Sequence, residues 1–325
     1  MPRALDGERL DRAVALAAGV SRRQATDLVA SGRVTVAGEV VTSGARRVRL
    51  GQTVAVDLPP PAPGGPPRAD PDVEVPVVYV DEHLVVVDKP AGVAVHPGAG
   101  RASGTLVQGL LARFSDLGGL GGEDPERPGI VHRLDMGTSG LLVVARTATA
   151  RDRLAAQLSA RAVRREYLGL AIGSIGSRSG MIDAPLGRSP ADPTRVRVQA
   201  GGREARTRYE VVARHDLPAP TTLLRLRLET GRTHQIRVHL SSIGHPLLGD
   251  DRYGGRPARG PLVPAAALLG QGRPFLHAVV LAFEHPASGK RMLFTSPLPA
   301  DLAAVLEALG PSTRRDGRRR GGPAR

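Results

Sequence analysis

The stretch GIVHRLDMGTSGLLVVA, residues 129 to 145, sets a single carboxylate, Asp135, in a polar turn between two apolar segments. The segments IVHRL and GLLVVA have the composition of strands, and DMGTSG between them consists of turn-forming residues. This pattern predicts two strands joined by a tight loop that carries Asp135. An aspartate in a turn most often accepts hydrogen bonds from nearby backbone amides, so a role in chemistry needs further support.

Three features of the sequence give that support. Arg133 and His132 lie just upstream of Asp135, and a nearby positive charge keeps an aspartate ionised. Tyr167, in RREYLGLAIG, is expected on a strand with its ring inward and a polar tip, although such a tyrosine alone is more often a core residue. The stretch ETGRTHQIRVHL, residues 229 to 240, crowds polar groups into a segment otherwise suited to a strand or a short helix. Those polar residues are Arg232, His234, Gln235, Arg237 and His239.

The nine histidines could supply a metal site, but their spacing argues against one. His234 and His239 are five residues apart, which is about 140° on a helix and opposite faces of a strand, so they could not chelate one ion unaided. No carboxylate-rich cluster adds ligands, and the chain has no cysteine. It also has no Walker loop, dinucleotide-binding glycine fingerprint or Gly-x-Ser-x-Gly elbow. The remaining chemistry is that of an ionised Asp, a set of Arg residues and a Tyr, with no metal and no cofactor.

The charge balance points to a polyanionic partner. The 325-residue chain has a formal net charge of +14 and a sequence pI of about 11.3, which suits phosphate backbones or anionic membranes. A membrane is the weaker alternative, because no run of about 18 apolar residues occurs. The apolar patch at 13–20 follows three acidic residues, which a secretory signal would avoid. We therefore expect a cytoplasmic protein with no membrane partner.

Composition divides the chain into four parts. The proline-dense stretch LPPPAPGGPPRADPDVEVP, residues 58 to 76, favours an extended linker and excludes a helix. The C-terminal PSTRRDGRRRGGPAR has a charge of +5 and too few apolar residues to offset the entropy of ordering. It is either a solubilising end or an arm that attracts phosphates. We expect a small domain at 1–57, a linker at 58–72, the main domain at 73–310 and a disordered basic tail at 311–325.

The residues before the linker predict two helices followed by strands. RLDRAVALA repeats apolar residues at helical spacing, SRRQATDLVASG opens with Ser21 and Gln24 in capping-box spacing, and RVTVAGEVV alternates as a strand. Arg22 and Arg23 fall in the first turn of the second helix and Arg33 just past its end. Their guanidiniums could dock phosphates beside helix-end amides, the alternative being a solvated basic face. About 50 residues here resemble the S4-type RNA-binding module.

The stretch HLVVVDKPAGVAVHPGAG, residues 83 to 100, predicts a buried strand, a turn and a second extended segment. Lys89 and His96 are its polar exceptions. A lone histidine beside proline is more often a satisfied structural residue than a functional one, so His96 is only a secondary candidate.

Taken together, these strings resemble the RNA pseudouridine synthases, specifically the ribosomal large-subunit class with an S4-type module in front. The resemblance runs from residue 6 to about residue 300, and the strings occur in the family's order. In one departure, many relatives have Arg-Asp after the catalytic Asp, whereas this chain has Met136 and Gly137. The matching strings are KPAGVAVHP, HRLDMGTSGLLVVA, EYLGL, ARTRYEVV, TGRTHQIRVH, GHPLLGD, YG and LHA.

The resemblance implies a role for each residue of the site. The catalytic group is Asp135, with Tyr167 stacked on the uracil and Arg237 paired with Asp135 in a desolvated pocket, where an isolated anion would be costly. Arg133 is expected to help hold the flipped-out nucleotide. Further substrate-binding candidates are Arg232, His234 and Gln235.

The fold expected is α+β, with a mixed, mainly antiparallel central sheet flanked by helices and loops, preceded by a small S4-like α/β domain. The implied reaction isomerises uridine to pseudouridine without a cofactor. The expected partner of this monomer is RNA, namely large-subunit ribosomal RNA or an assembling ribosomal subunit. The alternatives are a transfer RNA substrate, a noncatalytic RNA-binding assembly factor, and an RNA base glycosidase that uses the same carboxylate.

The missing metal-ligand cluster makes a prediction about chelators. Turnover on RNA should be the same in excess EDTA as in untreated enzyme, because no metal ion takes part in the chemistry. The measurement is the initial rate with and without EDTA in a magnesium-free buffer. A loss of activity in EDTA that zinc restores would contradict this prediction.

Overall fold

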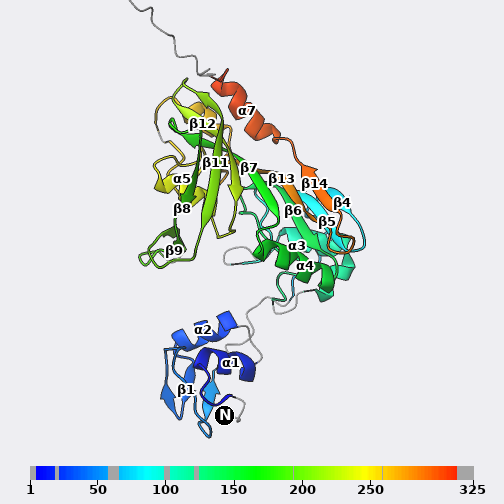
Figure 1. Cartoon of the computed structure of the whole chain (residues 1–325), viewed down its shortest axis with the longest axis vertical. Helices are drawn as coiled ribbons and strands as arrows, with labels where there is room; N and C mark the ends of the chain where they lie inside the picture. The colour runs from blue at the N-terminus through cyan, green and yellow to red at the C-terminus, as the bar shows by residue number, and fades with distance from the viewer. Residues whose placement is uncertain are drawn as a thin grey trace, which may run out of the picture. The chain divides into compact units, whose positions relative to one another are not determined.

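The computed structural model describes residues 5–18, 22–57, 66–98, 103–120, 124–192, 194–257 and 259–312. The chain divides into two compact units, residues 1–67 with 121–128, and residues 68–120 with 129–325 (Figure 1). Much of the predicted linker (58–65) and almost all of the predicted tail (313–325) lie outside the described residues, and their character stays a prediction. Among the helices in the described ranges, none combines the length and apolar character needed to cross a bilayer.

The N-terminal unit has the predicted order of two helices followed by strands. Helices α1 (Leu10–Ala18) and α2 (Arg22–Ala30) pack on a three-stranded antiparallel sheet of order β2-β1-β3. The apolar repeat of α1 buries Leu10 and Val14 in one cluster with Val34 and Val36 of the sheet. Burial of such side chains stabilises the unit by roughly 1.5–3 kcal/mol each. The strands are β1 (Val34–Val36), β2 (Glu39–Val40) and β3 (Val54–Val56).

The larger unit is built on a nine-stranded sheet of order β4-β5-β6-β13-β7-β12-β11-β8, with β14 paired to β13. All neighbouring strands are antiparallel except β6 and β13, which are parallel. The expected α+β fold with a mixed, mainly antiparallel sheet is therefore confirmed. The strands are β4 (Val77–Val80), β5 (Leu84–Lys89), β6 (Ser139–Ala145), β7 (Arg164–Ile172), β8 (Ser179–Asp183), β11 (Arg206–His215), β12 (Thr221–Leu228), β13 (Leu276–Glu284) and β14 (Arg291–Thr295), and a separate ribbon pairs β9 (Leu186–Arg188) with β10 (Val196–Val198).

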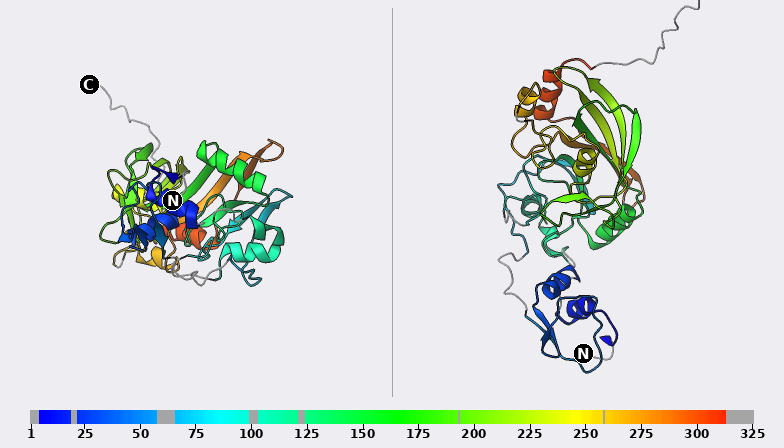
Figure 2. Two further views of the ribbon diagram at one scale, coloured as in Figure 1. Left: turned by 90° about the horizontal axis from the view of Figure 1, so that it is seen from below. Right: turned by 90° about the vertical axis from the view of Figure 1, so that its left-hand side faces the viewer.

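Helices and apolar clusters cover both faces of this sheet. Side chains alternate along β7, so Tyr167 and Leu170 point to opposite faces. Tyr167 shares the main core with Ile236 of α5, whereas Leu170 packs with Phe275 and with Leu302 of α7. Figure 2 shows the curved sheet in its right-hand view, with the yellow-green helix α5 against it. The helices of this unit are α3 (Leu106–Arg113), the 3-10 helix η2 (Ser115–Gly119), α4 (Ala148–Ser159), α5 (Gln235–Ser242), α6 (Val263–Ala267) and α7 (Ala300–Leu309).

The parallel pair β6–β13 brings the start of β6 against the start of β13. His277 lies opposite Ser139 and Ala278 opposite Gly140. At Gly140 the backbone has φ +116°, and a Cβ there would lie 2.4 Å from the carbonyl oxygen of Ala278. Only glycine allows this close approach. The loop that carries Asp135 leads directly into this junction.

Two expectations about strands are wrong. GLLVVA is the fully buried strand β6, but IVHRL forms only an isolated bridge, from Ile130 to Val144. The reason is that the amide of Val143 donates to the imidazole Nε2 of His132, at 3.2 Å, so a side chain replaces part of the backbone ladder. The extended segment expected after Lys89 is likewise reduced to an isolated bridge at Ala94.

Candidate active site

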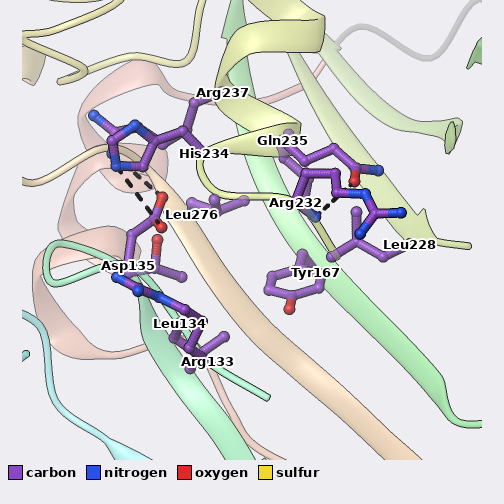
Figure 3. A pocket seen from close by; sticks show the side chains of 12 residues that line it. Arg133, Leu134, Asp135, Tyr167, Leu228, Arg232, His234, Gln235, Arg237 and Leu276 are labelled. Atoms are coloured by element: carbon purple, nitrogen blue, oxygen red, sulfur yellow. Dashed lines mark hydrogen bonds and ion pairs between the residues drawn. The ribbon is translucent and has the colours of Figure 1, made fainter. Parts of the chain in front are cut away.

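Asp135 and Tyr167 line one pocket in the larger unit, together with residues from the start of α5 (Figure 3). Asp135 lies in the loop before β6, and Tyr167 lies on β7. The pocket therefore joins four stretches that are far apart in the sequence, and it includes all seven predicted active-site and substrate-binding residues. Its lining consists of Arg133, Leu134, Asp135, Thr138, Tyr167, Leu228, Arg232, His234, Gln235, Ile236, Arg237 and Leu276.

The pairing expected between Asp135 and Arg237 is present. The Nη1 group of Arg237 donates to Asp135 Oδ2 at 3.3 Å, as the dashed lines of Figure 3 show. The exposed fractions of the two side chains are only 15% for Asp135 and 11% for Arg237. Charges this poorly hydrated interact more strongly than they would at the surface. The pair therefore places two opposite charges side by side in the wall of the pocket.

A second carboxylate, Asp250, holds the other side of the same guanidinium. Arg237 donates from Nε and Nη2 to the two oxygens of Asp250, at 2.7 and 2.9 Å. Asp250 is fully buried and also accepts from the amides of Arg252 and Tyr253, at 3.0 and 3.1 Å. Burial alone would lower the pKa of Arg237, but the bonds to Asp250 and the charge of Asp135 outweigh it and raise that pKa.

Sequence reasoning did not assign Asp250 a role. It ends the string GHPLLGD, which belongs to the family resemblance, so the signal was present, but no local pattern shows that this carboxylate reaches Arg237. Tyr253, from the string YG, was also missed. The Arg237 guanidinium lies over the Tyr253 ring, 5.1 Å from its centre, in cation–π geometry.

His234 precedes α5 in the left-handed region, with φ 55°. Its Nδ1 lies 2.8 Å from the Tyr253 hydroxyl, and its Nε2 lies 4.0 Å from Asp135 Oδ1. Burial lowers the pKa of His234, and attraction to Asp135 opposes only part of that effect. His234 is therefore a neutral imidazole near pH 7, able to donate or accept a hydrogen bond at the pocket wall.

Tyr167 forms an apolar wall of the pocket beside Leu228 and Leu276. Only 4% of the residue is exposed, and burial raises the pKa of its phenol to about 12. The hydroxyl therefore stays protonated at neutral pH. The ring, rather than an anionic oxygen, is what Tyr167 offers to a ligand.

Gln235 and Arg232 differ in how much of each side chain is free. The Gln235 carbonyl accepts from Thr230 and from the Arg232 amide, while its NH2 group donates to the Arg206 carbonyl and to Thr207. All of its hydrogen-bonding capacity is thus used to hold the loop before α5. Arg232 is exposed, lines the pocket and donates from Nε to the Glu204 carbonyl.

Arg133 and His132, the two polar residues just upstream of Asp135, differ in charge and exposure. Arg133 is exposed at the pocket and lies 3.2 Å from His96 Nε2, and His96 is buried beside it. The expectation that His132 places a positive charge beside Asp135 is wrong. Enclosure of its imidazole, with repulsion from Arg165, lowers the pKa of His132 to about 3. His132 is neutral and serves as the acceptor for β6.

Backbone contacts support the loop around Asp135. The carbonyl of Met136 accepts from the Gly92 amide at 2.9 Å and from the Lys89 ammonium at 3.2 Å. Lys89 is fully buried and also donates to the carbonyls of Pro90 and Val93. Burial lowers the pKa of Lys89 to about 7. These contacts reach the loop through its main chain, whichever side chain stands at position 136.

The predicted RNA-contacting arginines lie in the N-terminal unit. Arg22 is exposed at the start of α2, and Arg33 is exposed and pairs with Asp57 at 3.0 Å. Arg23 is on α2, but its side chain is outside what the structure describes. Within the described ranges, no group of three or more His, Asp or Glu residues is placed to hold a metal ion. His239 instead contacts Thr207 and the Ala184 carbonyl.

Two family signatures match the chain. That of RNA pseudouridylate synthase matches residues 83–242, and that of the S4 domain matches residues 8–54. The S4 signature and the carboxylate-centred site together define a class of enzyme that works on RNA. The chain belongs to the RNA pseudouridylate synthase family.

Similar proteins cover nearly the whole chain. The ribosomal large subunit pseudouridine synthase D of Pseudomonas aeruginosa is 43% identical over 320 residues, which are 95% of this chain and 94% of that protein. The protein of the same name from Vibrio parahaemolyticus is 42% identical over 316 residues, 96% of this chain and 94% of its own. The solved structure of human RNA pseudouridylate synthase domain containing 1 has a TM-score of 0.54 at 26% identity and covers 73% of this chain and 95% of its own.

The shared guanidinium generates a testable expectation for Asp250→Asn. An asparagine accepts through one oxygen only and carries no charge, so Arg237 loses its bidentate partner and can shift away from Asp135. We expect the free energy of unfolding to fall by about 3 kcal/mol, the usual cost of breaking a buried ion pair. Turnover should fall at least tenfold with RNA affinity unchanged.

The matched control is Asp183→Asn, which removes an exposed carboxylate paired with Arg206 at 3.0 Å. Because surface ion pairs contribute about 0–1 kcal/mol, this variant should behave as wild type. Denaturant unfolding and single-turnover rates measure both effects. Equal behaviour of the two variants would refute the role given to Asp250.

Proposed function

We propose that this protein isomerises a uridine of large-subunit ribosomal RNA to pseudouridine. The single observation that carries the proposal is the Asp135–Arg237 pair, which lies in one pocket with the ring of Tyr167. The names of the P. aeruginosa and V. parahaemolyticus relatives support ribosomal RNA as the substrate. The S4 domain supports an RNA partner in general.

The chemistry needs a carboxylate and no redox group. The reaction breaks the N1–C1′ bond of uridine, turns the base and joins C1′ to C5, while a proton leaves C5 and N1 gains one. An ionised carboxylate can attack the electrophilic carbon or remove a proton beside the sugar cation. Both steps use Asp135 as the anion, and Arg237 lies 3.3 Å from its Oδ2 as the charge partner.

The walls of the pocket suit an extruded uridine. Stacking on an aromatic ring contributes about 1–3 kcal/mol per base, and the buried ring of Tyr167 offers such a surface. Taking the base out of its stack costs roughly a few kcal/mol. Arg133 and Arg232 are exposed at the pocket, where guanidiniums can bind the flanking phosphates and offset that cost.

The two remaining substrate-binding candidates receive different roles. His234 is a neutral donor or acceptor 4.0 Å from Asp135, and we assign it to the polar edge of the uracil. Gln235 is a positioning residue rather than a substrate ligand, because its amide is saturated by Thr230, Thr207 and backbone groups. It fixes the loop that begins α5 and therefore the direction of Arg237.

The domain organisation follows from the same proposal. We assign residues 1–57 to RNA binding, 58–72 to a linker, 73–310 to catalysis and 311–325 to a basic tail. We propose that the protein acts as a monomer. Ribosomal RNA as the substrate supports a cytoplasmic location.

Three alternatives are separated by product analysis. A transfer RNA synthase would leave ribosomal RNA unchanged, and a glycosidase would release free uracil instead of pseudouridine. A noncatalytic assembly factor would have no use for Asp135 and Arg237 paired beside Tyr167. Mapping pseudouridines in ribosomal and transfer RNA from cells that lack this protein identifies both the substrate and the uridine.

Asp135→Asn tests whether Asp135 is the reacting group. The substitution keeps the size of the side chain and most of its hydrogen bonding, so the free energy of unfolding should change by only about 1 kcal/mol. Tritium release from C5-labelled uridine in transcribed ribosomal RNA should be lost. RNA affinity should equal or exceed that of wild type, because one negative charge is removed. Appreciable turnover by a folded Asn variant would refute the assignment.

The double variant Arg22→Ala, Arg33→Ala tests the N-terminal arginines in the full chain. Each phosphate contact contributes about one unit to the slope of log affinity against log salt, so the slope should fall by up to about 2. The control is Lys290→Ala, Arg291→Ala, which removes two exposed cations of the β13–β14 hairpin. If both variants keep the wild-type slope, the S4 arginines do not contact RNA.

A further inference from the structure

A buried arginine, Arg273, also contacts the Asp135 loop and lines one cavity together with Lys89. It is 4% exposed and lies three residues before Leu276, the first residue of β13. Its Nη1 donates to the carbonyl of Gly137 at 2.7 Å and to that of Leu276 at 3.1 Å. Its Nη2 donates to the hydroxyl of Ser139 at 2.9 Å. One guanidinium thus binds both ends of the turn that leads from Asp135 into β6.

The turn is also packed tightly against the segment that carries Arg273. A Cβ at Gly137 would lie 2.0 Å from the carbonyl oxygen of Gly272 and 2.9 Å from Cδ of Pro274. The amide of Thr138 donates back to the Asp135 carbonyl at 3.0 Å, which closes the turn. A displacement of Arg273 therefore moves the backbone two residues from the catalytic carboxylate.

A chain of hydrogen bonds fixes the guanidinium from behind. Ser139 Oγ lies 2.8 Å from His277 Nδ1, and His277 Nε2 lies 3.0 Å from Ser296 Oγ. Ser296 in turn donates to Asp88 Oδ2 at 2.5 Å. His277, Ser139 and Ser296 are all buried. The chain links the ends of β5, β6 and β13 to the segment before α7.

The two ends of the chain of hydrogen bonds, together with a neutral His277 ring, determine the direction of its protons. The guanidinium can only donate, so Ser139 accepts from Arg273, and with a neutral His277 ring Ser139 donates its own proton to Nδ1. Asp88 accepts the Ser296 proton, so Ser296 Oγ accepts from His277 Nε2–H. His277 is then the neutral Nε2–H tautomer. Burial lowers the pKa of His277, in agreement with a neutral ring.

A second carboxylate holds the outer side of Arg273. Nε of Arg273 donates to Asp301 Oδ2 at 2.7 Å, and Asp301 lies in the first turn of α7. Burial alone would raise the pKa of Asp301, but the hydrogen bond and charge of Arg273 outweigh it and lower that pKa. Arg273 is therefore held by the carboxylate of Asp301 on one side and by the hydrogen-bonded Ser139 on the other. A carboxylate holds Arg273 here as Asp250 holds Arg237.

We propose that Arg273 is a positioning residue for Asp135, and that the chain Ser139–His277–Ser296–Asp88 sets the orientation of its guanidinium. The inference rests on the proposed function of Asp135. Reacting groups must be held within a fraction of an ångström of the productive geometry, and a shift of about 1 Å can lower the rate by roughly 100-fold. A glycine-containing turn does not supply that rigidity by itself, and Arg273 does.

The first experiment is Arg273→Ala in the full chain. We expect turnover to fall roughly 100-fold with unchanged affinity for ribosomal RNA. A cavity of about 370 Å³ borders Arg273 and Asp301, so free guanidinium can reach the vacated space. Millimolar guanidinium chloride should restore turnover several-fold, and sodium chloride at equal ionic strength should not. Arg273→Lys keeps the charge but cannot span Gly137, Ser139 and Asp301, so it should remain impaired.

The second experiment breaks the chain of hydrogen bonds that holds Arg273. His277→Phe keeps an aromatic ring and loses both hydrogen bonds, so turnover should fall by a smaller factor than in Arg273→Ala, with RNA affinity unchanged. The matched control is His285→Gln, a buried histidine just beyond the other end of β13 that pairs with Asp81. It should lose stability and keep its turnover. In wild type, 15N shifts of His277 should show the neutral Nε2–H tautomer.

A readout independent of activity completes the test. Hydrogen–deuterium exchange of residues 135–141 should accelerate in Arg273→Ala and not in His285→Gln. If wild type makes no pseudouridine in ribosomal RNA, the proposed function fails, and exchange alone still decides whether Arg273 orders the turn. If wild type is active and Arg273→Ala matches it in turnover and exchange, the inference is overturned. Turnover that falls only in step with the folded fraction also overturns it.

Discussion

The site depends on one guanidinium, that of Arg237, shared between two carboxylates. Asp250 has no exposure, and an unpaired charge there would be very costly, so it takes the two shorter bonds and fixes Arg237 in direction. The remaining nitrogen then reaches Asp135 at 3.3 Å. Because Asp250 takes Nε and Nη2 of Arg237, only Nη1 bonds to Asp135, and one oxygen of Asp135 has no bond to Arg237. The other oxygen, Oδ1, lies 4.0 Å from His234 Nε2 at the wall of the pocket.

The fold brings these charges together from distant parts of the chain. Asp135 precedes β6, Arg237 is on α5, and Asp250 follows the string GHPLLG. Strands β7 to β12 lie between Asp135 and Arg237 in the sequence. The close parallel pairing of β6 with β13 at Gly140 sets where the Asp135 loop emerges. The sheet therefore acts as the rigid frame, and the loops at its strand ends supply the chemistry.

Local patterns predicted what depends on local physics. An apolar repeat predicted the first N-terminal helix, capping-box spacing predicted the second, and strand composition predicted β6. The family strings predicted that Asp135, Arg237 and Tyr167 share a pocket. Tertiary contacts decided the rest. IVHRL has strand composition, but His132 takes the place of a backbone partner, and enclosure removes the charge that its sequence position suggested. The sequence suggested Gln235 as a substrate ligand, but its amide is bound to partners on β11. Nothing near Asp250 in the sequence indicates that it contacts Arg237.

The contacts that hold the Asp135 turn also account for the chain's departure from the family's Arg-Asp at the next two positions. Lys89 and Gly92 bind the carbonyl of residue 136, and Arg273 binds the carbonyl of residue 137. A carbonyl is present whatever the side chain, so none of these bonds is lost when Met136 and Gly137 replace a charged pair. Met136 is accordingly free to lie 46% exposed, and Gly137 is free to pack against Gly272. The main-chain carbonyls of the turn are thus held by buried side chains around it, while the turn itself needs the carboxylate of Asp135 and a glycine at 137, where a Cβ would lie 2.0 Å from the Gly272 carbonyl oxygen.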